Sequence, residues 1–187
     1  MNKVGSIHVI IGCMFSGKTT ELIRNAKRYK SIGKKVLVLN YKMDTRYGDN
    51  KIISHDLINE PAYMISSFDE IFQNEHLKKL YNESEFICIN EGQFFKNLKE
   101  FCINGANNDN KIIYVCGLDG DYKQEKFGDM IDLIPVCDSV KKLYALCKIC
   151  GEKASFTKRI ISKDNDQQVL IGSSESYLPV CRKHLQD

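Results

Sequence analysis

Short apolar runs alternate with amphipathic segments along the first two thirds of the chain. Runs of strand length cover residues 7–11, 36–39, 86–89 and 111–116, and a weaker one covers residues 62–65. The runs are apolar almost throughout, which is typical of strands buried on both faces of a parallel sheet. The pattern therefore predicts a parallel sheet in the interior of the protein.

Helical periodicity occupies the segments between these runs. Residues 19–31 place apolar side chains at helical spacing with many cations on the other side, and Gly33 ends the segment. Residues 68–80 and 95–103 suit two further helices. Strands that alternate with helices predict an α/β fold with both sheet faces covered.

The pattern changes near residue 140, where short β-like runs, loop residues and paired cysteine and histidine spacings replace the alternation. We therefore expect an α/β domain over residues 1–140 and a small second domain over residues 141–187. No internal repeat or low-complexity tract interrupts either part.

The amino-acid composition is that of an ordinary globular protein and indicates no particular class of partner. The chain is 43% hydrophobic and 27% charged, with a net charge of +3. These values are ordinary for a globular protein, and so small a charge gives no support to a nucleic-acid partner. No run approaches the roughly 20 apolar residues that cross a membrane, and the N-terminus does not resemble a signal peptide. We expect a cytoplasmic protein with no membrane partner.

A glycine-bearing loop follows the first apolar run and matches the phosphate-loop pattern, with a strand before it and a helix after it. Its glycines let backbone N–H groups curl around phosphate oxygens, and the helix N-terminus adds its positive end. Lys18 should reach the β- and γ-phosphates of ATP, and the Thr19 hydroxyl should ligate Mg²⁺. The residues expected to bind ATP and Mg²⁺ here are Gly12, Cys13, Met14, Phe15, Ser16, Gly17, Lys18 and Thr19.

An acidic residue, Glu91, follows the apolar run at residues 86–89. It would emerge at the carboxyl end of the sheet, where ligands bind in open α/β folds. A carboxylate there could accept a proton from a substrate hydroxyl as a general base. Taken alone, an exposed loop glutamate fits the sequence equally well.

The eight cysteines divide into two groups. Five are scattered, several within apolar runs, and are expected to be small buried hydrophobes: Cys13, Cys88, Cys102, Cys116 and Cys137. The other three form, with one histidine, a Cys-x-x-Cys and a Cys-x-x-His pair, which predict a tetrahedral zinc site. Four protein ligands leave no open position, so this zinc should be structural and should fasten the base of the loop between the pairs. The expected ligands are Cys147, Cys150, Cys181 and His184.

Together these segments resemble the cytosolic and viral type of thymidine kinase over nearly the whole chain. Six motifs occur in the family's order, which is far more specific than the phosphate loop alone. The matching segments are residues 14–19 (phosphate loop), 44–47 (Asp-x-Arg-Tyr), 91–95 (catalytic base), 117–122 with 127–128 (thymine pocket), 157–159 with 171–177 (thymidine lasso), and the paired zinc ligands.

The resemblance implies a RecA-like α/β domain with a phosphate loop, a zinc-held lasso domain that closes over the nucleoside, and a homotetramer. It also implies transfer of the γ-phosphate of ATP to the 5′-hydroxyl of thymidine, which gives dTMP in pyrimidine salvage for DNA synthesis, and to that of deoxyuridine. Glu91 would be the base, while Lys18 and Arg46 would stabilise charge on the transferring group.

The resemblance further implies residues that surround Mg²⁺ and the nucleoside. Asp44 and Asn90 would lie near the phosphates and Mg²⁺. The backbone of the lasso would grip the pyrimidine by hydrogen bonds. The residues expected to bind the nucleoside are Met14, Phe95, Leu118, Tyr122, Phe127, Arg159, Gln168, Val169, Leu170, Ile171, Gly172 and Tyr177.

Two positions depart from the family pattern. Asn90 stands where the family usually has aspartate before the catalytic glutamate. Because asparagine can accept a hydrogen bond from a Mg²⁺-bound water but brings no charge, we expect weaker Mg²⁺ binding, with Asp44 compensating, rather than loss of activity. Tyr122 stands where phenylalanine is common, which keeps an aromatic wall but adds a hydroxyl that needs a partner.

Three other functions share some of these features. A zinc-containing ATPase stimulated by nucleic acid would use the same loop and metal, but the chain lacks an aromatic and basic stripe near the metal ligands. A GTPase switch would need an Asn-Lys-x-Asp segment, which the chain lacks. A regulatory relative without catalysis has only Asn90 in its favour.

Overall fold

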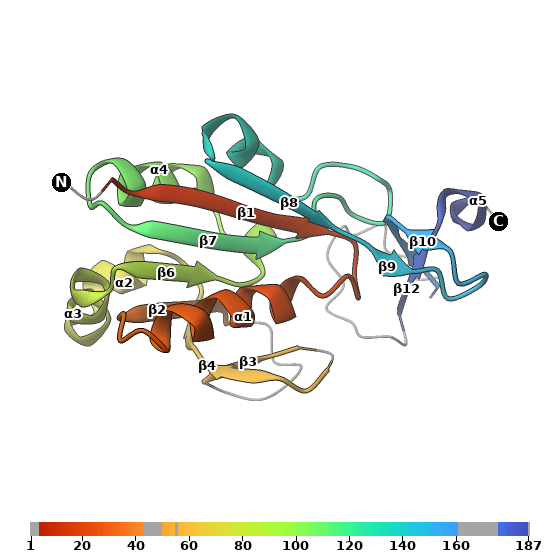
Figure 1. Ribbon diagram of the computed structural model, residues 1–187. Coiled ribbons are helices and arrows are strands. Elements are labelled where there is room, and N and C mark those ends of the chain that lie inside the picture. The colour runs from red at the N-terminus through yellow and green to blue at the C-terminus, as the bar shows by residue number, and fades with distance from the viewer. Residues whose placement is uncertain (1–3, 43–49, 55, 161–175, 187) are drawn as a thin grey trace.

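Six parallel strands form the central sheet of the computed structural model, which describes residues 4–42, 50–54, 56–160 and 176–186 (Figure 1). The strands lie in the order β5-β2-β6-β7-β1-β8, and every neighbouring pair is parallel. The carboxyl ends of the parallel strands therefore meet at one edge of the sheet. The strands are β1 (Ser6–Gly12), β2 (Val36–Tyr41), β5 (Tyr63–Ile65), β6 (Phe86–Ile89), β7 (Ile112–Gly117) and β8 (Ser139–Leu143).

Helices cover both faces of this sheet because successive strand residues point to opposite sides. On one face Ile10 and Val38 pack with the apolar side of α1 (Lys18–Lys30). On the other face Val9 and Leu39 belong to a larger cluster. That second face is covered by α2 (Asp69–Gln73), α3 (Glu75–Glu83), α4 (Leu98–Asn107) and the 3₁₀ helix η2 (Ile131–Val136). The predicted buried parallel sheet is confirmed.

Smaller elements complete the described chain. A hairpin of β3 (Lys51–Ile53) and β4 (Asn59–Pro61) packs beside α1, with Ile52 in the α1-side core. After the last sheet strand, two two-stranded sheets and a short helix form a separate cluster at the carboxyl edge (Figure 1). These elements are β9 (Ala145–Leu146), β10 (Lys153–Ala154), β11 (Phe156–Arg159), β12 (Tyr177–Val180) and α5 (Arg182–Leu185).

Two predicted helices differ from the structure. The single helix expected over residues 68–80 is wrong, because Asn74 has extended backbone and divides it into α2 and α3. The Asn74 side chain accepts hydrogen bonds from the backbone N–H groups of His76 (2.9 Å) and Leu77 (3.1 Å), and so caps α3. The helix expected over residues 95–103 begins at Leu98 and continues to Asn107.

The expected domain boundary after residue 140 divides a strand. Strand β8 pairs with β1 through Leu143, so the sheet continues three residues beyond that boundary. The apolar periodicity did not reveal this strand because most of its residues are exposed at the edge of the sheet.

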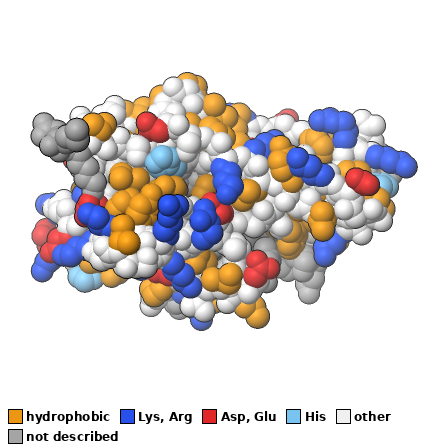
Figure 2. All heavy atoms as spheres, in the orientation of Figure 1, with side chains coloured by type: hydrophobic (Ala, Val, Ile, Leu, Met, Phe, Trp, Pro, Cys, Tyr) orange, Lys and Arg blue, Asp and Glu red, His pale blue; other side chains and the backbone are white. Residues whose placement is uncertain are grey.

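Surface and core residues otherwise follow the expected distribution. Of the five scattered cysteines, Cys137 is half-buried and the other four are buried. The α1 cations Arg24, Lys27, Arg28 and Lys30 are exposed. Figure 2 shows Lys and Arg side chains among apolar ones on the face of the molecule that it draws. Among the described residues, no helix combines the length and the apolar character needed to span a membrane.

Candidate active site

The loop between β1 and α1 has the geometry of a phosphate-binding turn. Phe15 and Gly17 adopt left-handed backbone conformations, with φ of 63° and 82°. Left-handed residues in a turn direct successive backbone N–H groups toward one point, where an anion can bind. Gly12 is required for packing, since a Cβ there would meet the Leu143 carbonyl oxygen and lie 2.8 Å from Ser16 Oγ.

The Lys18 ammonium group folds over this loop. Its Nζ donates a hydrogen bond to the Cys13 carbonyl oxygen at 2.7 Å, and Ser16 Oγ donates to the same oxygen at 2.8 Å. Burial lowers the pKa of Lys18, and the nearby Glu91 carboxylate opposes that shift. The cation is thus held beside the turn, where a phosphate would offer it an anionic acceptor.

Thr19 and Asn90 bring two neutral oxygens together at the carboxyl edge of the sheet. Thr19 Oγ1 donates to Asn90 Oδ1 at 3.1 Å, across the space between α1 and β6. Asn90 is 3% exposed and follows directly on β6. Mg²⁺ prefers oxygen ligands and usually keeps several waters, so these oxygens fit a Mg²⁺ site that is completed by water and phosphate.

Glu91 lies one residue further along and adopts a left-handed backbone with φ 55° and ψ 42°. Such a conformation is costly for a residue other than glycine and is often found where a side chain must be aimed. Gln93 Nε2 donates to Glu91 Oε2 at 2.6 Å, while Gln93 Oε1 accepts from the Leu118 N–H at 3.0 Å. Gln93 thereby ties the carboxylate to the segment after β7, a role that sequence reasoning missed.

That segment forms a turn ordered by a buried aspartate. Asp121 is 6% exposed, and its Oδ1 accepts from the N–H groups of Lys123 (2.8 Å) and Glu125 (2.9 Å). The turn leads to Phe127, whose buried ring meets Phe94 edge to face with centroids 5.5 Å apart. Aspartate in a glycine-containing stretch is a common turn signal, which could have identified the role of Asp121.

Aromatic and cationic side chains from three distant segments meet beside this turn. The Arg159 guanidinium carbon lies 4.8 Å from the centre of the Tyr122 ring and 6.0 Å from that of Tyr177. Three residues expected at the nucleoside are therefore neighbours in the fold.

The four expected zinc ligands form one cluster. Their ligand atoms all lie within 4.8 Å of one another. Zinc with Zn–S about 2.3 Å and Zn–N about 2.0 Å would place tetrahedral sulfur pairs about 3.8 Å apart and sulfur–nitrogen pairs about 3.5 Å apart. Cys150 and Cys181 sulfurs are 3.8 Å apart, and His184 Nδ1 lies 3.3 Å from Cys181 Sγ and 3.6 Å from Cys147 Sγ. The donor set therefore fits tetrahedral zinc.

The pKa of one ligand of the cluster, Cys147, also suits a metal. Burial acts to raise the pKa of Cys147, but backbone hydrogen bonds at Cys181, Ile149 and Cys150 and a hydrogen bond with His184 outweigh it, so that the pKa falls to about 6. A thiolate is the form that binds zinc. The backbone thus stabilises a ligand in its metal-binding state.

The metal-ligand region contacts the phosphate loop directly. Cys13 belongs to a small apolar cluster with Ala154 and Val180, and its thiol donates to the Ala154 carbonyl at 3.5 Å. The Met14 N–H donates to Thr157 Oγ1 at 3.0 Å. Sequence spacing gave no sign of this contact, which joins residues more than 140 positions apart.

One expected nucleoside-binding residue, Phe95, lies in the core. Phe95 is 2% exposed and stacks on Phe68 with ring centroids 4.7 Å apart, so it lies in the core beneath the site. Other expected site residues lie outside the described residues: Asp44, Arg46, Gln168, Val169, Leu170, Ile171 and Gly172.

Comparison with known proteins agrees with this geometry. The family model described as thymidine kinase matches residues 5–185. "Thymidine kinase a" of Arabidopsis thaliana is 46% identical over 184 residues, which cover 96% of this chain and 74% of that protein. The thymidine kinase of Yaba monkey tumor virus is 43% identical over 97% of this chain and 94% of its own length. "Thymidine kinase 1" of Dictyostelium discoideum is 38% identical over 95% of this chain and 76% of its own length. The chain therefore belongs to the thymidine kinase family.

Proposed function

We propose that this protein transfers the γ-phosphate of ATP to the 5′-hydroxyl of thymidine, giving dTMP for DNA synthesis, and also to that of deoxyuridine, giving dUMP. The observation that carries the proposal is the meeting of Lys18, the Thr19–Asn90 pair and Glu91 at one edge of the sheet. Phosphoryl transfer depends mainly on positioning and charge stabilisation, and these groups supply both.

Binding of ATP would begin at the turn from Gly12 to Thr19. Its backbone N–H groups and the N-terminus of α1 face the phosphates, and Lys18 Nζ would exchange the Cys13 carbonyl for a phosphate oxygen. Arg46 would add a second cation. Charge that develops on the transferring group would therefore meet fixed positive groups.

Glu91 would accept the proton of the 5′-hydroxyl as the oxygen attacks the γ-phosphorus. The hydrogen bond from Gln93 Nε2 to Oε2 holds the Glu91 carboxylate in place. A positioned base of this kind contributes about 10²- to 10⁴-fold to the rate.

Thr19, Asn90 and Asp44 are the residues that would hold Mg²⁺, which neutralises phosphate charge when bound. Since Asn90 carries no charge, we infer weaker Mg²⁺ binding than an aspartate would give. An Asn90→Asp variant with unchanged Mg²⁺ dependence would remove this idea.

The part of the chain after the sheet would act as a second, zinc-held domain that closes over the nucleoside. Tyr122, Phe127 and Tyr177, with Met14 and Leu118, would border the base, and Arg159 would support this wall. The backbone of residues 168–172 would bind the pyrimidine edge, with Phe95 supporting the wall from the core. We propose a cytoplasmic homotetramer, in keeping with the resemblance of the sequence to the family.

A phosphoryl-transfer assay with ATP, Mg²⁺ and each common nucleoside tests the proposal. We expect dTMP and dUMP formation, and a collapse of both in a Glu91→Gln variant that still binds ATP. Hydrolysis of ATP that responds to single-stranded DNA and not to any nucleoside would contradict the proposal and favour a nucleic-acid-stimulated ATPase.

A further inference from the structure

Two asparagines end neighbouring strands and contact each other in the interior. Asn40 lies in β2 and Asn90 follows β6, and they are 2% and 3% exposed. The register that pairs Leu39 with Ile89 brings the next residue of each strand to the same level. Asn90 Nδ2 donates to Asn40 Oδ1 at 2.9 Å. This buried contact has no part in the function proposed above.

The opposite side of the Asn90 amide faces the phosphate loop. Its Oδ1 accepts from Thr19 Oγ1 at 3.1 Å and from the Cys116 thiol at 3.0 Å. A hydroxyl that donates its only proton to Asn90 has its lone pairs directed elsewhere. Thr19 is therefore presented as an oxygen ligand for a cation.

The reversed amide orientation would have the opposite effect. Asn90 Nδ2 would then donate to Thr19 Oγ1 and would compete with a cation for its lone pairs. Asn40 opposes this reversal, because its Oδ1 would then face the Asn90 carbonyl oxygen in place of an N–H group, while its own Nδ2 is directed to Met64 Sδ at 3.7 Å. The direction of the Asn90 amide is thus set from the side away from the phosphates.

We propose that Asn40 is a positioning residue for Mg²⁺·ATP, which acts by holding the Asn90 oxygen toward Thr19. The proposal rests on the proposed function and adds a residue that touches neither ATP nor nucleoside in that account. Partners that orient metal-binding groups commonly change metal affinity by about 10- to 100-fold when they are removed.

Calorimetric titration of ATP into the whole protein, with Mg²⁺ or with EDTA, tests the proposal without any phosphoryl transfer. For Asn40→Leu we expect the Mg²⁺-dependent gain in ATP affinity to fall about 10-fold, while affinity in EDTA stays near the wild-type value. In the kinase assay, the Mg²⁺ concentration for half-maximal rate should rise, with a much smaller change in kcat at saturating Mg²⁺.

Rescue by a conservative variant separates positioning from packing. Asn40→Asp keeps an oxygen that accepts from Asn90 Nδ2, so it should restore most of the Mg²⁺ dependence. Asn25→Leu is the matched control, because Asn25 is a buried asparagine of α1 that donates to the Glu21 carbonyl, away from Asn90. It should lower thermal stability and leave the Mg²⁺ dependence unchanged.

A second test uses charge. Asn90→Asp alone adds a single carboxylate beside the neutral Asn40 amide and should have the smaller effect. Asn40→Asp with Asn90→Asp would place two buried carboxylates against each other, which disfavours ionisation of both. The double variant should therefore show a loss far greater than the combined single effects.

Several outcomes would overturn the proposal. One is that Asn40→Leu keeps the Mg²⁺ dependence of the wild-type protein. Another is that Asn40→Leu loses as much ATP affinity in EDTA as in Mg²⁺. A third is that the effects of the two single substitutions add up in the double variant. Should Asn40→Leu fail to fold, Asn40→Ala carries the same prediction, because it also removes the acceptor. A wild-type protein that couples Mg²⁺ to ATP but phosphorylates no nucleoside would refute the proposed function and leave this inference standing.

Discussion

The sheet and the metal-ligand region hold their active groups in different ways. Strands β1, β6 and β7 are paired on both sides and packed between two apolar clusters, so Gly12 and Asn90 extend from a rigid interior. In the region after Leu143, the described residues 144–160 and 176–186 form two two-stranded sheets, a four-residue helix and a small apolar cluster. An apolar side chain of this region, Leu146, remains 71% exposed and so adds little to its core.

The difference indicates which force stabilises each region. Two-stranded sheets are at best marginally stable in water, and so small a core supplies little burial energy. Four metal ligands within one cluster can supply what burial does not. We therefore infer that the sheet depends on apolar packing, whereas the region after it would depend on a metal bound by this cluster and on its contacts with the phosphate loop at Cys13 and Met14.

The largest expected effect separates chemistry from stability. Glu91→Gln should lower kcat by about 10²- to 10⁴-fold, because the neutral amide cannot accept the 5′-hydroxyl proton. Thermal unfolding should change little, since the side chain lies at the edge of the sheet and keeps its size. Steady-state kinetics beside a thermal melt measures both. A small change in kcat would assign the base to another group.

Loss of a zinc ligand should affect only the smaller region. Cys150→Ser leaves three ligands, so zinc content should fall and backbone amides after residue 143 should lose protection from hydrogen exchange. The backbone amides of β1 and β7 should keep their protection from hydrogen exchange. Cys137→Ser is the matched control, because Cys137 is half-buried and outside the cluster. Equal loss of protection in the sheet would contradict independent stabilisation.

Gly12→Ala tests the junction between the two regions. The added Cβ would meet the Leu143 carbonyl at the end of β8, and the substitution should cost about 2–4 kcal/mol and weaken ATP binding. Gly33→Ala is the control, since Gly33 has φ 75° and open space around it. It should cost only about 1 kcal/mol, with ATP binding unchanged. Denaturant unfolding and ATP titration give the two readouts, and equal effects would refute the role of packing at Gly12.

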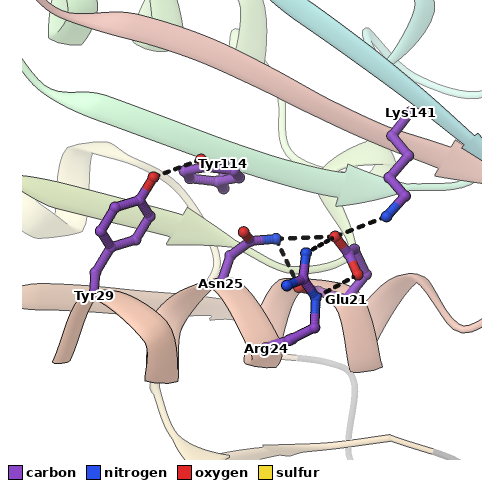
Figure 3. A network of polar contacts seen from close by, with 6 residues as sticks. All are labelled: Glu21, Arg24, Asn25, Tyr29, Tyr114 and Lys141. Atoms are coloured by element: carbon purple, nitrogen blue, oxygen red, sulfur yellow. Dashed lines mark hydrogen bonds and ion pairs between the residues drawn. The ribbon is translucent and has the colours of Figure 1, made fainter. Parts of the chain in front are cut away.

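The smallest expected effect concerns a charged network between α1 and β8. Glu21 accepts hydrogen bonds from Arg24 (2.7 Å), lies 3.0 Å from Lys141 Nζ of β8, and receives a longer bond from Asn25 (Figure 3). The hydrogen bond from Arg24 is the main cause that lowers the Glu21 pKa to about 2, against the opposing effect of burial.

Because the folded pKa is below the unfolded value, this stabilisation is present above about pH 4.5 and is lost as the pH falls toward 2. Glu21→Gln should therefore lower the free energy of unfolding at pH 7 by roughly 1–2 kcal/mol, and the difference should vanish near pH 2. Glu83→Gln, which removes an exposed partner of Lys35, should have a smaller effect. A pH-independent difference in denaturant unfolding would show that the network acts through packing alone.

Sequence patterns predicted the sheet well because a strand buried on both faces must be apolar throughout. Residues 86–89 match β6 at both ends. Edge strand β8 was missed as part of the sheet, since its exposed residues carry no such pattern. The division at Asn74 was missed because a side-chain cap competed locally with an apolar periodicity that continues through it.

The site was predictable where chemistry fixes spacing along the chain. The phosphate loop and the paired metal ligands are of this kind, and the ligand cluster was confirmed. Asn40, Gln93 and Thr157 act through contacts between distant segments, and single polar residues of these types occur throughout any chain. Only the folded arrangement shows what they hold in place.

The central claim is that the sheet binds ATP and that the region after it binds the nucleoside. It is tested most directly by measuring ATP and thymidine binding separately, before and after zinc removal by a chelator. We predict that thymidine binding is lost, because the proposed zinc-held region would close over the nucleoside, while ATP binding is weakened but retained on the sheet. Thymidine binding that survives zinc removal, or complete loss of both ligands together, would contradict it.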